Sequence, residues 1–276
     1  MTISFGDLVS SLSTLGIDSP RLEARMMLAD VLNVDINVIG ADISVDGEQE
    51  AEVKQMLARR MKHEPLDKIL GIKEFYKSSF VVNSDVLSPR PDSEILVEEA
   101  IKIAKQNNLD KIIEFGVGSG CLILSILQDV PQMSGLGFDK SEKALEIAKQ
   151  NAKRLGLESR INFEKFDYFN DETEAKTSLI ISNPPYIPTS DIDELDEEVK
   201  KYDPFMALDG GEDGYVHYRR IAEIAPLILE DGGYILLEGG IGQADMITEI
   251  FADKGLKPVN KVCDLSGIER CIILKK

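Results

Sequence analysis

Four consecutive residues have the chemistry and the stiffness needed to hold a planar amine: Asn183-Pro184-Pro185-Tyr186. They follow an apolar run that predicts a buried strand ending at Ser182. Because prolines have no N–H to donate to a strand ladder, we expect a stiff turn at the carboxyl end of this strand, where open α/β sheets bind ligands. The Asn183 side-chain oxygen and the Pro184 carbonyl offer two acceptors there, with the Tyr186 ring beside them. This set fits an amide or an exocyclic NH₂ group, which has two donors and a planar face.

A glycine-rich segment at the end of an earlier predicted strand is the second candidate site: Glu114-Phe115-Gly116-Val117-Gly118-Ser119-Gly120. Glycines at alternate positions let the backbone approach a ligand closely and turn sharply into a helix. The spacing is neither the G-x-G-x-x-G of dinucleotide folds nor a P-loop, which needs a Lys-Ser/Thr pair. Taken alone, the segment is equally compatible with a tight turn that binds nothing.

Acidic residues at the next two predicted strand ends indicate what this loop binds. Asp139 lies about twenty residues beyond the glycines, where an acidic side chain accepts hydrogen bonds from ribose hydroxyls. Asp167 can accept from an exocyclic amino group, and Tyr168 can stack on a purine. Each acid alone is also compatible with a helix N-cap or a solvated strand end, but together they predict a nucleoside site that lacks a means of holding phosphates. S-adenosylmethionine fits such a site; Glu114 would help hold its ammonium group, directly or through water, and Asn183 would border it.

Composition limits the class of protein. The 276 residues are 43% hydrophobic and 29% charged, as in soluble globular proteins, and no apolar stretch reaches the length of a membrane span. The amino terminus lacks the basic region of a signal peptide. Cys121, Cys263 and Cys271 have no metal-binding spacing, so we expect reduced core thiols and a cytoplasmic protein. His63 and His217 are isolated, so we expect structural histidines and no metal site.

The strongly acidic balance bears on the substrate. With 31 Lys and Arg against 49 Asp and Glu, the formal net charge is −18. Nucleic-acid binding depends on Lys and Arg contacts to phosphates, so this charge argues against a nucleic-acid substrate, although a local basic patch remains compatible with it. An acidic surface suits a basic protein partner, or it serves solubility alone.

Hydrophobic periodicity divides the chain into three predicted parts. Residues 1–66 form a small helical domain, with helices over 5–15, 22–32 and 53–61. Residues 67–90 are a linker, with a β-hairpin over 69–82. Residues 91–276 alternate between helix and strand, which is typical of a parallel sheet with crossover helices. We predict helices over 92–106, 121–127, 141–155, 215–229 and 243–252, strands over 111–115, 134–139, 161–166, 178–182 and 233–238, and a terminal antiparallel pair, 256–264 and 270–274.

The glycine loop followed by the Asn-Pro-Pro-Tyr turn resembles class I methyltransferases of the amino type. The wider pattern is similar to the HemK/PrmC family, the N5-glutamine methyltransferases of peptide chain release factors. The segments that carry this similarity are Glu64-Pro65-Leu66, Ile69-Leu70-Gly71, Glu74-Phe75, Val86-Leu87-Ser88-Pro89-Arg90-Pro91-Asp92-Ser93-Glu94, the turn and the stretch after it to Asp213-Gly214, Leu237-Glu238-Gly239 with Gln243, and Asp264-Leu265-Ser266-Gly267 with Arg270. Departures are mild: Glu114, Phe115 and Tyr168 stand where the family usually has Asp, Leu and Trp.

The resemblance implies a class I S-adenosylmethionine-dependent methyltransferase fold, an α/β fold with a Rossmann-like mixed seven-stranded sheet, a small N-terminal helical domain and a β-hairpin linker. It also implies methyl transfer to the glutamine of the Gly-Gly-Gln motif in peptide chain release factors. Asn183, Pro184 and Tyr186 would be catalytic and, with Pro185 and Arg90, would bind the substrate. The cofactor would be held by Asp139, Asp167, Tyr168, Asn183 and the whole segment from Glu114 to Gly120.

Several roles stay open at this point. Arg90 either orients substrate or forms a structural ion pair between the linker and the catalytic domain. Glu238 either lines the site or caps the next turn, and we favour the structural role. The acidic residues within 188–213 indicate a lid or a partner-contact surface, although a charge run is usually a solvated helix face. The N-terminal domain would recognise the protein substrate, with packing alone as the alternative. We expect a monomer.

Three other functions use some of the same features. A ribosomal-protein glutamine methyltransferase would perform the same chemistry. An adenine-N6 nucleic-acid methyltransferase shares the Asn-Pro-Pro-Tyr motif, but the absence of a basic stripe argues against it. A binding module without catalysis would have little use for that motif beside a nucleoside site.

Overall fold

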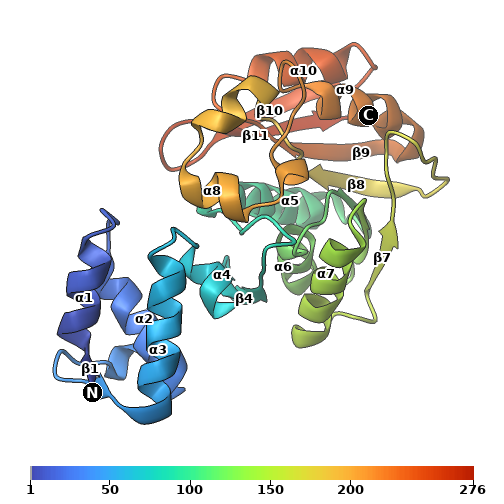
Figure 1. The fold of residues 1–276 in the computed structure, drawn as a ribbon. Helices are drawn as coiled ribbons and strands as arrows, with labels where there is room; N and C mark the ends of the chain where they lie inside the picture. Colours follow the sequence, from blue (N-terminus) through green and yellow to red (C-terminus); the bar gives the residue numbers. More distant parts are fainter. Residues whose placement is uncertain (1) are drawn as a thin grey trace. The chain divides into compact units, whose positions relative to one another are not determined.

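The computed structural model describes residues 2–276 and divides them into two compact units (Figure 1). Unit 1 contains the chain up to Ile72 together with Asp196–Tyr202, and unit 2 contains Lys73–Leu195 and Asp203–Lys276. Met1, which belongs to the predicted 1–66 domain, lies outside the described residues. The domain boundaries at residues 66 and 90 stay a prediction.

Unit 1 is mainly helical. Its elements are β1 (Ile3–Ser4), α1 (Phe5–Ser13), α2 (Pro20–Leu32), η1 (Ile36–Val38), β2 (Ser44–Val45), α3 (Gly47–Arg60), α4 (Leu66–Leu70) and α8 (Glu197–Tyr202). The three predicted helices are present. One prediction here is wrong, because residues 69–70 lie in helix α4 and not in a hairpin strand. Pro65 precedes the first turn of α4, where a missing N–H has no cost, and Gly71 ends the helix with a left-handed φ of 73°.

A buried arginine joins three segments of unit 1. The Arg60 side chain is 3% exposed, and its Nε lies 2.7 Å from Glu23 and its Nη1 2.6 Å from Glu198. The hydroxyl of Tyr202 donates to the carbonyl of Lys62 at 2.9 Å. Helix α8 is therefore held to the end of α3, and at least Glu198 of the acidic segment 188–213 has a structural partner.

Unit 2 is built on a seven-stranded sheet in the order β10-β11-β9-β8-β5-β6-β7. Its strands are β5 (Lys111–Phe115), β6 (Ser134–Asp139), β7 (Ile161–Lys165), β8 (Thr177–Ser182), β9 (Leu229–Glu238), β10 (Lys257–Cys263) and β11 (Glu269–Lys275). Strands β5 to β9 pair in parallel, whereas β11 runs antiparallel to both β9 and β10. The predicted mixed sheet is confirmed, and the bounds of β5 and β6 are as predicted.

Helices cover both faces of this sheet (Figure 1). The helices of unit 2 are η2 (Pro91–Ser93), α5 (Glu94–Asn107), α6 (Cys121–Asp129), α7 (Glu142–Arg154), η3 (Thr189–Glu194), η4 (Phe205–Ala207), α9 (Val216–Ile228) and α10 (Ala244–Ala252). Leu179 and Ile181 pack towards α5 and α6, and Ile180 packs towards α9 and α10. This alternation along β8 follows from the two-residue period of a strand, and it buries the sheet on both faces.

Smaller features complete unit 2. Strands β3 (Ile72–Phe75) and β4 (Ser78–Val81) form the predicted hairpin, shortened at its start. Ser141 caps α7 as predicted, because its side chain accepts from the N–H of Ala144. The three cysteines are free, but Cys263 is exposed on the edge strand β10, so its prediction as a core thiol is wrong. None of the helices within residues 2–276 is both long and apolar enough for a membrane span.

Candidate active site

A cavity of about 320 Å³ lies at the carboxyl ends of β5, β6, β7 and β8, and every residue that lines it belongs to unit 2. Its wall includes seven of the residues predicted from the sequence: Gly116, Gly118, Asp139, Asp167, Tyr168, Asn183 and Pro185. Other predicted residues lie outside the described cavity wall: Glu114, Phe115, Val117, Ser119, Gly120, Pro184, Tyr186 and Arg90. The topology thus brings the glycine loop, both acidic strand ends and the Asn-Pro-Pro-Tyr turn to one place.

The glycine loop needs its glycines for two different reasons. Gly116, Gly118 and Gly120 have φ angles of 73°, 52° and 80°, in the left-handed region that other residues avoid. A Cβ at Gly116 or Gly118 would meet nothing within 4 Å, whereas one at Gly120 would lie 3.0 Å from the Leu124 side chain. The first two therefore leave space above the loop for a ligand, and the third allows α6 to pack closely beneath it.

Two carboxylates project into the cavity with different partners. Asp139 accepts hydrogen bonds from the N–H groups of Ser141 at 2.8 Å and Gly118 at 2.9 Å, yet burial raises its pKa. The hydrogen bond from Lys140, 2.8 Å away, lowers the pKa of Asp167, and Asn170 also donates to it at 2.8 Å. An ionised carboxylate has about four acceptor positions, so both side chains keep the capacity to accept from a ligand.

Tyr168 is held in place by His217, which also lines the cavity. The ring nitrogen Nε2 of His217 lies 3.0 Å from the carbonyl of Asp209, and Nδ1 lies 2.5 Å from the Tyr168 hydroxyl. A carbonyl only accepts, so Nε2 carries the proton and Nδ1 accepts from the tyrosine. Burial lowers the pKa of His217, which keeps this tautomer neutral. His217 is thus a satisfied histidine, as predicted, and it orients the ring expected beside a purine.

Glu114 lies below the glycine loop. Its side chain is buried, and it accepts a hydrogen bond at 3.1 Å from the N–H of Ile123 in the first turn of α6. Burial raises its pKa well above the ordinary value. The structure therefore uses Glu114 to satisfy a free N–H at a helix start, and its role as the partner of an ammonium group stays a prediction.

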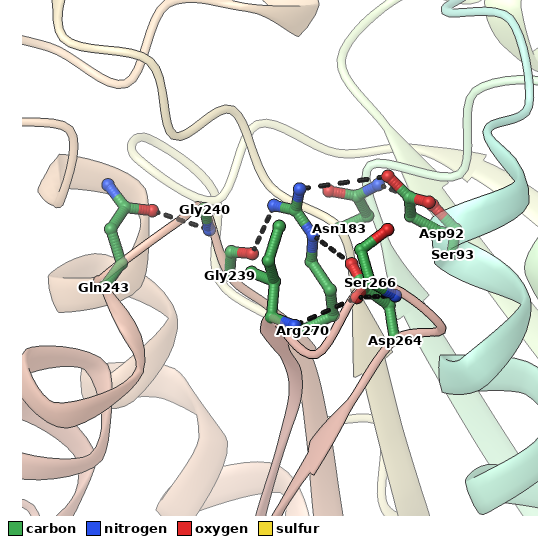
Figure 2. Close-up of polar contacts among 10 residues, drawn as sticks. Asp92, Ser93, Asn183, Gly239, Gly240, Gln243, Asp264, Ser266 and Arg270 are labelled. Atoms are coloured by element: carbon green, nitrogen blue, oxygen red, sulfur yellow. Dashed lines mark hydrogen bonds and ion pairs between the residues drawn. The ribbon is translucent and has the colours of Figure 1, made fainter.

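The Asn-Pro-Pro-Tyr turn is held from several sides, and Figure 2 shows its Asn183 near Ser93 and the pair Gln243–Gly240. The side-chain nitrogen of Asn183 lies 3.4 Å from the hydroxyl of Ser93. The carbonyl of Tyr186 accepts from Nε2 of Gln243 at 3.0 Å, while the Gln243 oxygen accepts from the N–H of Gly240 at 2.8 Å. Burial raises the pKa of the Tyr186 hydroxyl, so the ring stays neutral at physiological pH. The turn is therefore a fixed platform.

Glu238 ends β9 next to this turn, and its carboxyl group is buried. Burial raises the pKa of Glu238 to about 7, and hydrogen bonding from Ser93 and Asn183 and the charge of Arg270 only partly oppose this. Arg270 itself is fixed by the Gly239 carbonyl at 3.1 Å and by Asp264 at 3.2 Å (Figure 2). No local sequence pattern predicts a site role for Ser93, Lys140 or His217. Glu238 was a candidate because it ends a predicted strand.

Arg90 forms an ion pair within unit 2. Its guanidinium lies 3.1 Å from the Asp203 carboxylate, whose side chain is 3% exposed, and Asp203 also accepts from the N–H of Ser88 at 3.4 Å. Asp203 directly precedes the segment 204–207, which lines the cavity. This pairing supports the structural alternative for Arg90.

The residues around the cavity fit S-adenosylmethionine. The open space above Gly116 and Gly118 admits a ligand against the backbone, and Asp139 has acceptor capacity left for hydroxyl groups. Val86, Ala144 and Phe166 add apolar wall on which a flat base can rest. No residue set within 2–276 resembles the Lys-bearing loop that a phosphate-rich ligand requires.

Comparisons with known proteins agree with this geometry. Two family models match the chain, the PrmC N-terminal domain over residues 7–71 and the Methyltransferase small domain over residues 91–198. The release factor glutamine methyltransferases of Caulobacter vibrioides and Geobacter sulfurreducens are each 37% identical to it, over 95% of this chain and 91% of each relative. The enzyme of the same name from Rhodospirillum rubrum is 38% identical, over 96% of this chain and 82% of the relative.

Among solved structures, the catalytic domain of hMettl16, in complex with the MAT2A 3′UTR hairpin 6, matches with a TM-score of 0.57 over 84% of both chains. At 12% identity this similarity concerns the fold alone. The sequence relatives give more information than the fold, because each of them matches at least 95% of this chain at 37–38% identity. The mixed seven-stranded sheet is that of a class I methyltransferase, and the chain belongs to the family of release factor glutamine methyltransferases.

Proposed function

We propose that this chain transfers a methyl group from S-adenosylmethionine to the side-chain amide nitrogen of the glutamine in the Gly-Gly-Gln segment of peptide chain release factors. The bond from sulfur to the methyl carbon breaks as the nitrogen–carbon bond forms, and the products are N5-methylglutamine, S-adenosylhomocysteine and a proton released to water. The observation that carries the proposal is that Asn183 lines the same cavity as Gly118 and Asp139. A nucleoside site and a set of acceptors for an NH₂ group thus share one space, and the family to which the chain belongs supports the choice of substrate.

The cofactor would be held by the backbone of Gly116 and Gly118, by Asp139 on the ribose, and by Asp167 and Tyr168 on the adenine. When bound, S-adenosylmethionine supplies an electrophilic methyl group on a sulfonium. The chain contributes orientation, because Asp139 and Tyr168 are already fixed by Ser141 and His217. Pre-ordered groups lose little freedom on binding, so more of their interaction energy appears as affinity.

The acceptor amide would be held by Asn183 and Pro184. The Asn183 oxygen and the Pro184 carbonyl accept the two amide hydrogens, which fixes the nitrogen and draws its lone pair out of resonance as charge develops. Tyr186 packs against the amide plane. No strong base is needed, because the nitrogen becomes acidic only as the new bond forms. Positioning and electrostatic stabilisation of this kind are typically worth roughly 10²–10³ in rate for one well-placed polar group.

Recognition of the protein substrate would involve several surfaces. Phe205 and Met206 line the cavity and are 58% and 49% exposed, so they offer an apolar rim to a loop that carries the glutamine. Unit 1 would bind other parts of the factor, and the acidic segment 188–213 would face a basic part of it. Binding should then weaken as ionic strength rises. We place this activity in the cytoplasm, where translation termination occurs, and propose a monomeric enzyme.

The direct test is transfer of labelled methyl from S-adenosylmethionine to purified release factors. The intact factor is compared with a variant in which the glutamine of Gly-Gly-Gln is replaced by alanine. Label on the intact factor alone supports both the chemistry and the substrate. Label on a ribosomal protein or on duplex DNA, with neither factor labelled, would overturn the substrate and leave the fold unaffected.

A further inference from the structure

Glu238 lies beside Asn183, the asparagine that would hold the acceptor amide in the proposed reaction. In the parallel pair β8–β9, Ser182 lies opposite Leu237, so the next residues along the two strands, Asn183 and Glu238, leave the sheet side by side. The backbone of Glu238 is anchored, because its carbonyl accepts from the buried Tyr218 hydroxyl at 2.7 Å. Its side chain is 3% exposed, and within residues 2–276 its Oε2 atom has no hydrogen-bond partner.

The proposed reaction requires one of two orientations of the Asn183 amide. The oxygen must face the substrate to accept an amide hydrogen, and the NH₂ group must face the protein. Figure 2 shows this NH₂ group turned towards Ser93, 3.4 Å away. A serine hydroxyl both donates and accepts, so Ser93 serves either orientation equally well. The choice therefore needs a neighbour that only accepts.

We propose that Glu238 is a positioning residue that selects the catalytically competent orientation of the Asn183 amide, an inference that rests on the proposed function. Its ionised carboxylate accepts from the NH₂ group and repels the Asn183 oxygen, which directs that oxygen to the substrate. Glu238 acts through Asn183, because it is not part of the described cavity wall.

The environment of Glu238 argues against a packing role alone. A buried carboxyl group without full hydrogen bonding destabilises a fold, and burial accordingly raises the pKa of Glu238. A glutamine or an apolar side chain would fill the same volume without that penalty. The charged and titratable groups that face it are Asp92, Cys121, Tyr186, Tyr218, Arg270 and Cys271. Of these, only Arg270 stabilises its ionised form.

The first experiment compares Glu238→Gln with the wild-type enzyme in methylation of the release factor at about pH 8, where a carboxyl group with a pKa of about 7 is mostly ionised. Glutamine has nearly the same shape but presents both a donor and an acceptor, so it cannot select one orientation of Asn183. We expect kcat to fall about tenfold while KM for the factor and Kd for S-adenosylmethionine stay within about twofold, as for a group that acts only in the transition state. Unchanged kcat in this folded variant would overturn the proposal.

The second experiment exchanges the two side chains. Asn183→Asp alone places two carboxyl groups side by side, where like charges hinder ionisation of both. In the double variant Asn183→Asp with Glu238→Gln, the new NH₂ group donates to the aspartate, whose other oxygen accepts from the substrate. We expect the double variant to exceed Asn183→Asp in kcat by about fivefold or more, whereas independent effects would multiply to a lower rate. A double variant no faster than Asn183→Asp would contradict the proposal.

Two further variants are controls. Glu230→Gln makes the same change at the other end of β9, where the side chain is exposed and 3.7 Å from Lys111, and it should leave kcat unchanged. Ser93→Ala should lower kcat by less than about threefold, because its contact does not select an orientation. A loss in Ser93→Ala as large as in Glu238→Gln would assign the orienting role to Ser93.

The experiments distinguish a wrong substrate assignment from a wrong role for Glu238. If the wild-type enzyme labels another acceptor, the release-factor assignment is wrong, and the same variants are compared on the acceptor that takes the label. If the wild-type enzyme labels the factor and the exchange of side chains brings no recovery, only the role of Glu238 is wrong.

Discussion

The candidate active site has two halves, and their polar side chains differ in how fully they are hydrogen-bonded. The cofactor half is Gly116, Gly118, Asp139, Asp167 and Tyr168, and the acceptor half is the turn 183–186 with Ser93 and Glu238. In the cofactor half, each polar side chain has a short partner, such as Ser141 for Asp139 and His217 for Tyr168. In the acceptor half, the side-chain nitrogen of Asn183 lies a long 3.4 Å from the Ser93 hydroxyl, and the Glu238 atom Oε2 has no hydrogen-bond partner among residues 2–276.

This difference indicates that the cofactor half mainly binds its ligand, whereas the acceptor half mainly stabilises the transition state. A half whose side chains are already held in place by short hydrogen bonds binds its ligand with little rearrangement and little gain specific to the transition state. A half with unused hydrogen-bonding capacity can interact more strongly as charge develops on the acceptor nitrogen. Substitutions in the cofactor half should therefore act mainly on KM for S-adenosylmethionine, and substitutions in the acceptor half mainly on kcat.

Asn183→Ala, in the acceptor half, should have the largest effect on kcat. Removal of the side-chain acceptor should lower kcat for release-factor methylation by roughly 10²–10³, because one fixed polar group in such a site is worth that much. Asn162→Ala, on the exposed side of β7, is the matched control and should retain full activity. Near-normal turnover by a folded Asn183→Ala enzyme would show that the acceptor half does not act mainly on kcat.

The two buried glutamates, Glu114 and Glu238, should make the free energy of unfolding depend on pH. Burial raises the pKa of Glu238 to about 7 from 4.5, so the folded chain holds a proton that the unfolded chain has already lost. The resulting stability is complete below pH 4.5 and is lost as pH rises through 7. It amounts to about 3 kcal/mol, and Glu238→Gln should abolish this part of the decline.

The measurement is the free energy of unfolding of both proteins in urea between pH 5 and pH 8, at about half-unit intervals. Glu114, whose pKa is raised in the same direction, remains in the variant, so some decline should persist. Parallel curves for the two proteins would show that Glu238 does not hold its proton into the neutral range.

Gly118→Ala tests the cofactor half. A Cβ at this φ of 52° is strained, and it projects into the space above the loop, so we expect KM for S-adenosylmethionine to rise about tenfold with a smaller change in kcat. Gly156→Ala is closely matched, because Gly156 has a φ of 69° and equally open surroundings but lies away from the cavity. It should lose about 1 kcal/mol of stability and no affinity for the cofactor. Equal KM changes in both variants would indicate a general effect of strain.

Arg90→Ala should have the smallest effect. The guanidinium is 46% exposed, and such partly solvated ion pairs contribute about 0–1 kcal/mol. We expect a small drop in thermal stability and a change in kcat of less than about threefold, as for other surface pairs. A large rise in KM for the release factor, measured beside Arg219→Ala as a surface control, would instead favour substrate binding by Arg90.

Local features of the chain were predictable from its sequence. The bounds of β5 and β6, the Ser141 cap, and the strand that ends before Asn183 follow from periodicity and from the backbone limits of proline and glycine. These signals act over a few residues, so no knowledge of distant contacts is needed. The exceptions include whole short helices, such as α4, because Pro65 is compatible both with the end of one helix and with the start of another.

Only the tertiary structure decided how distant residues share the site. Tyr168 and His217 are 49 residues apart, and Asn183 and Ser93 are 90 apart, so no local pattern could pair them. The same holds for the two strand-end glutamates. Glu114 lies under α6 and accepts from Ile123, whereas Glu238 emerges beside Asn183 with an oxygen unpartnered in the described chain. In sequence they are equivalent acids after apolar runs, and only the neighbouring strand and helix in the folded sheet make their environments different.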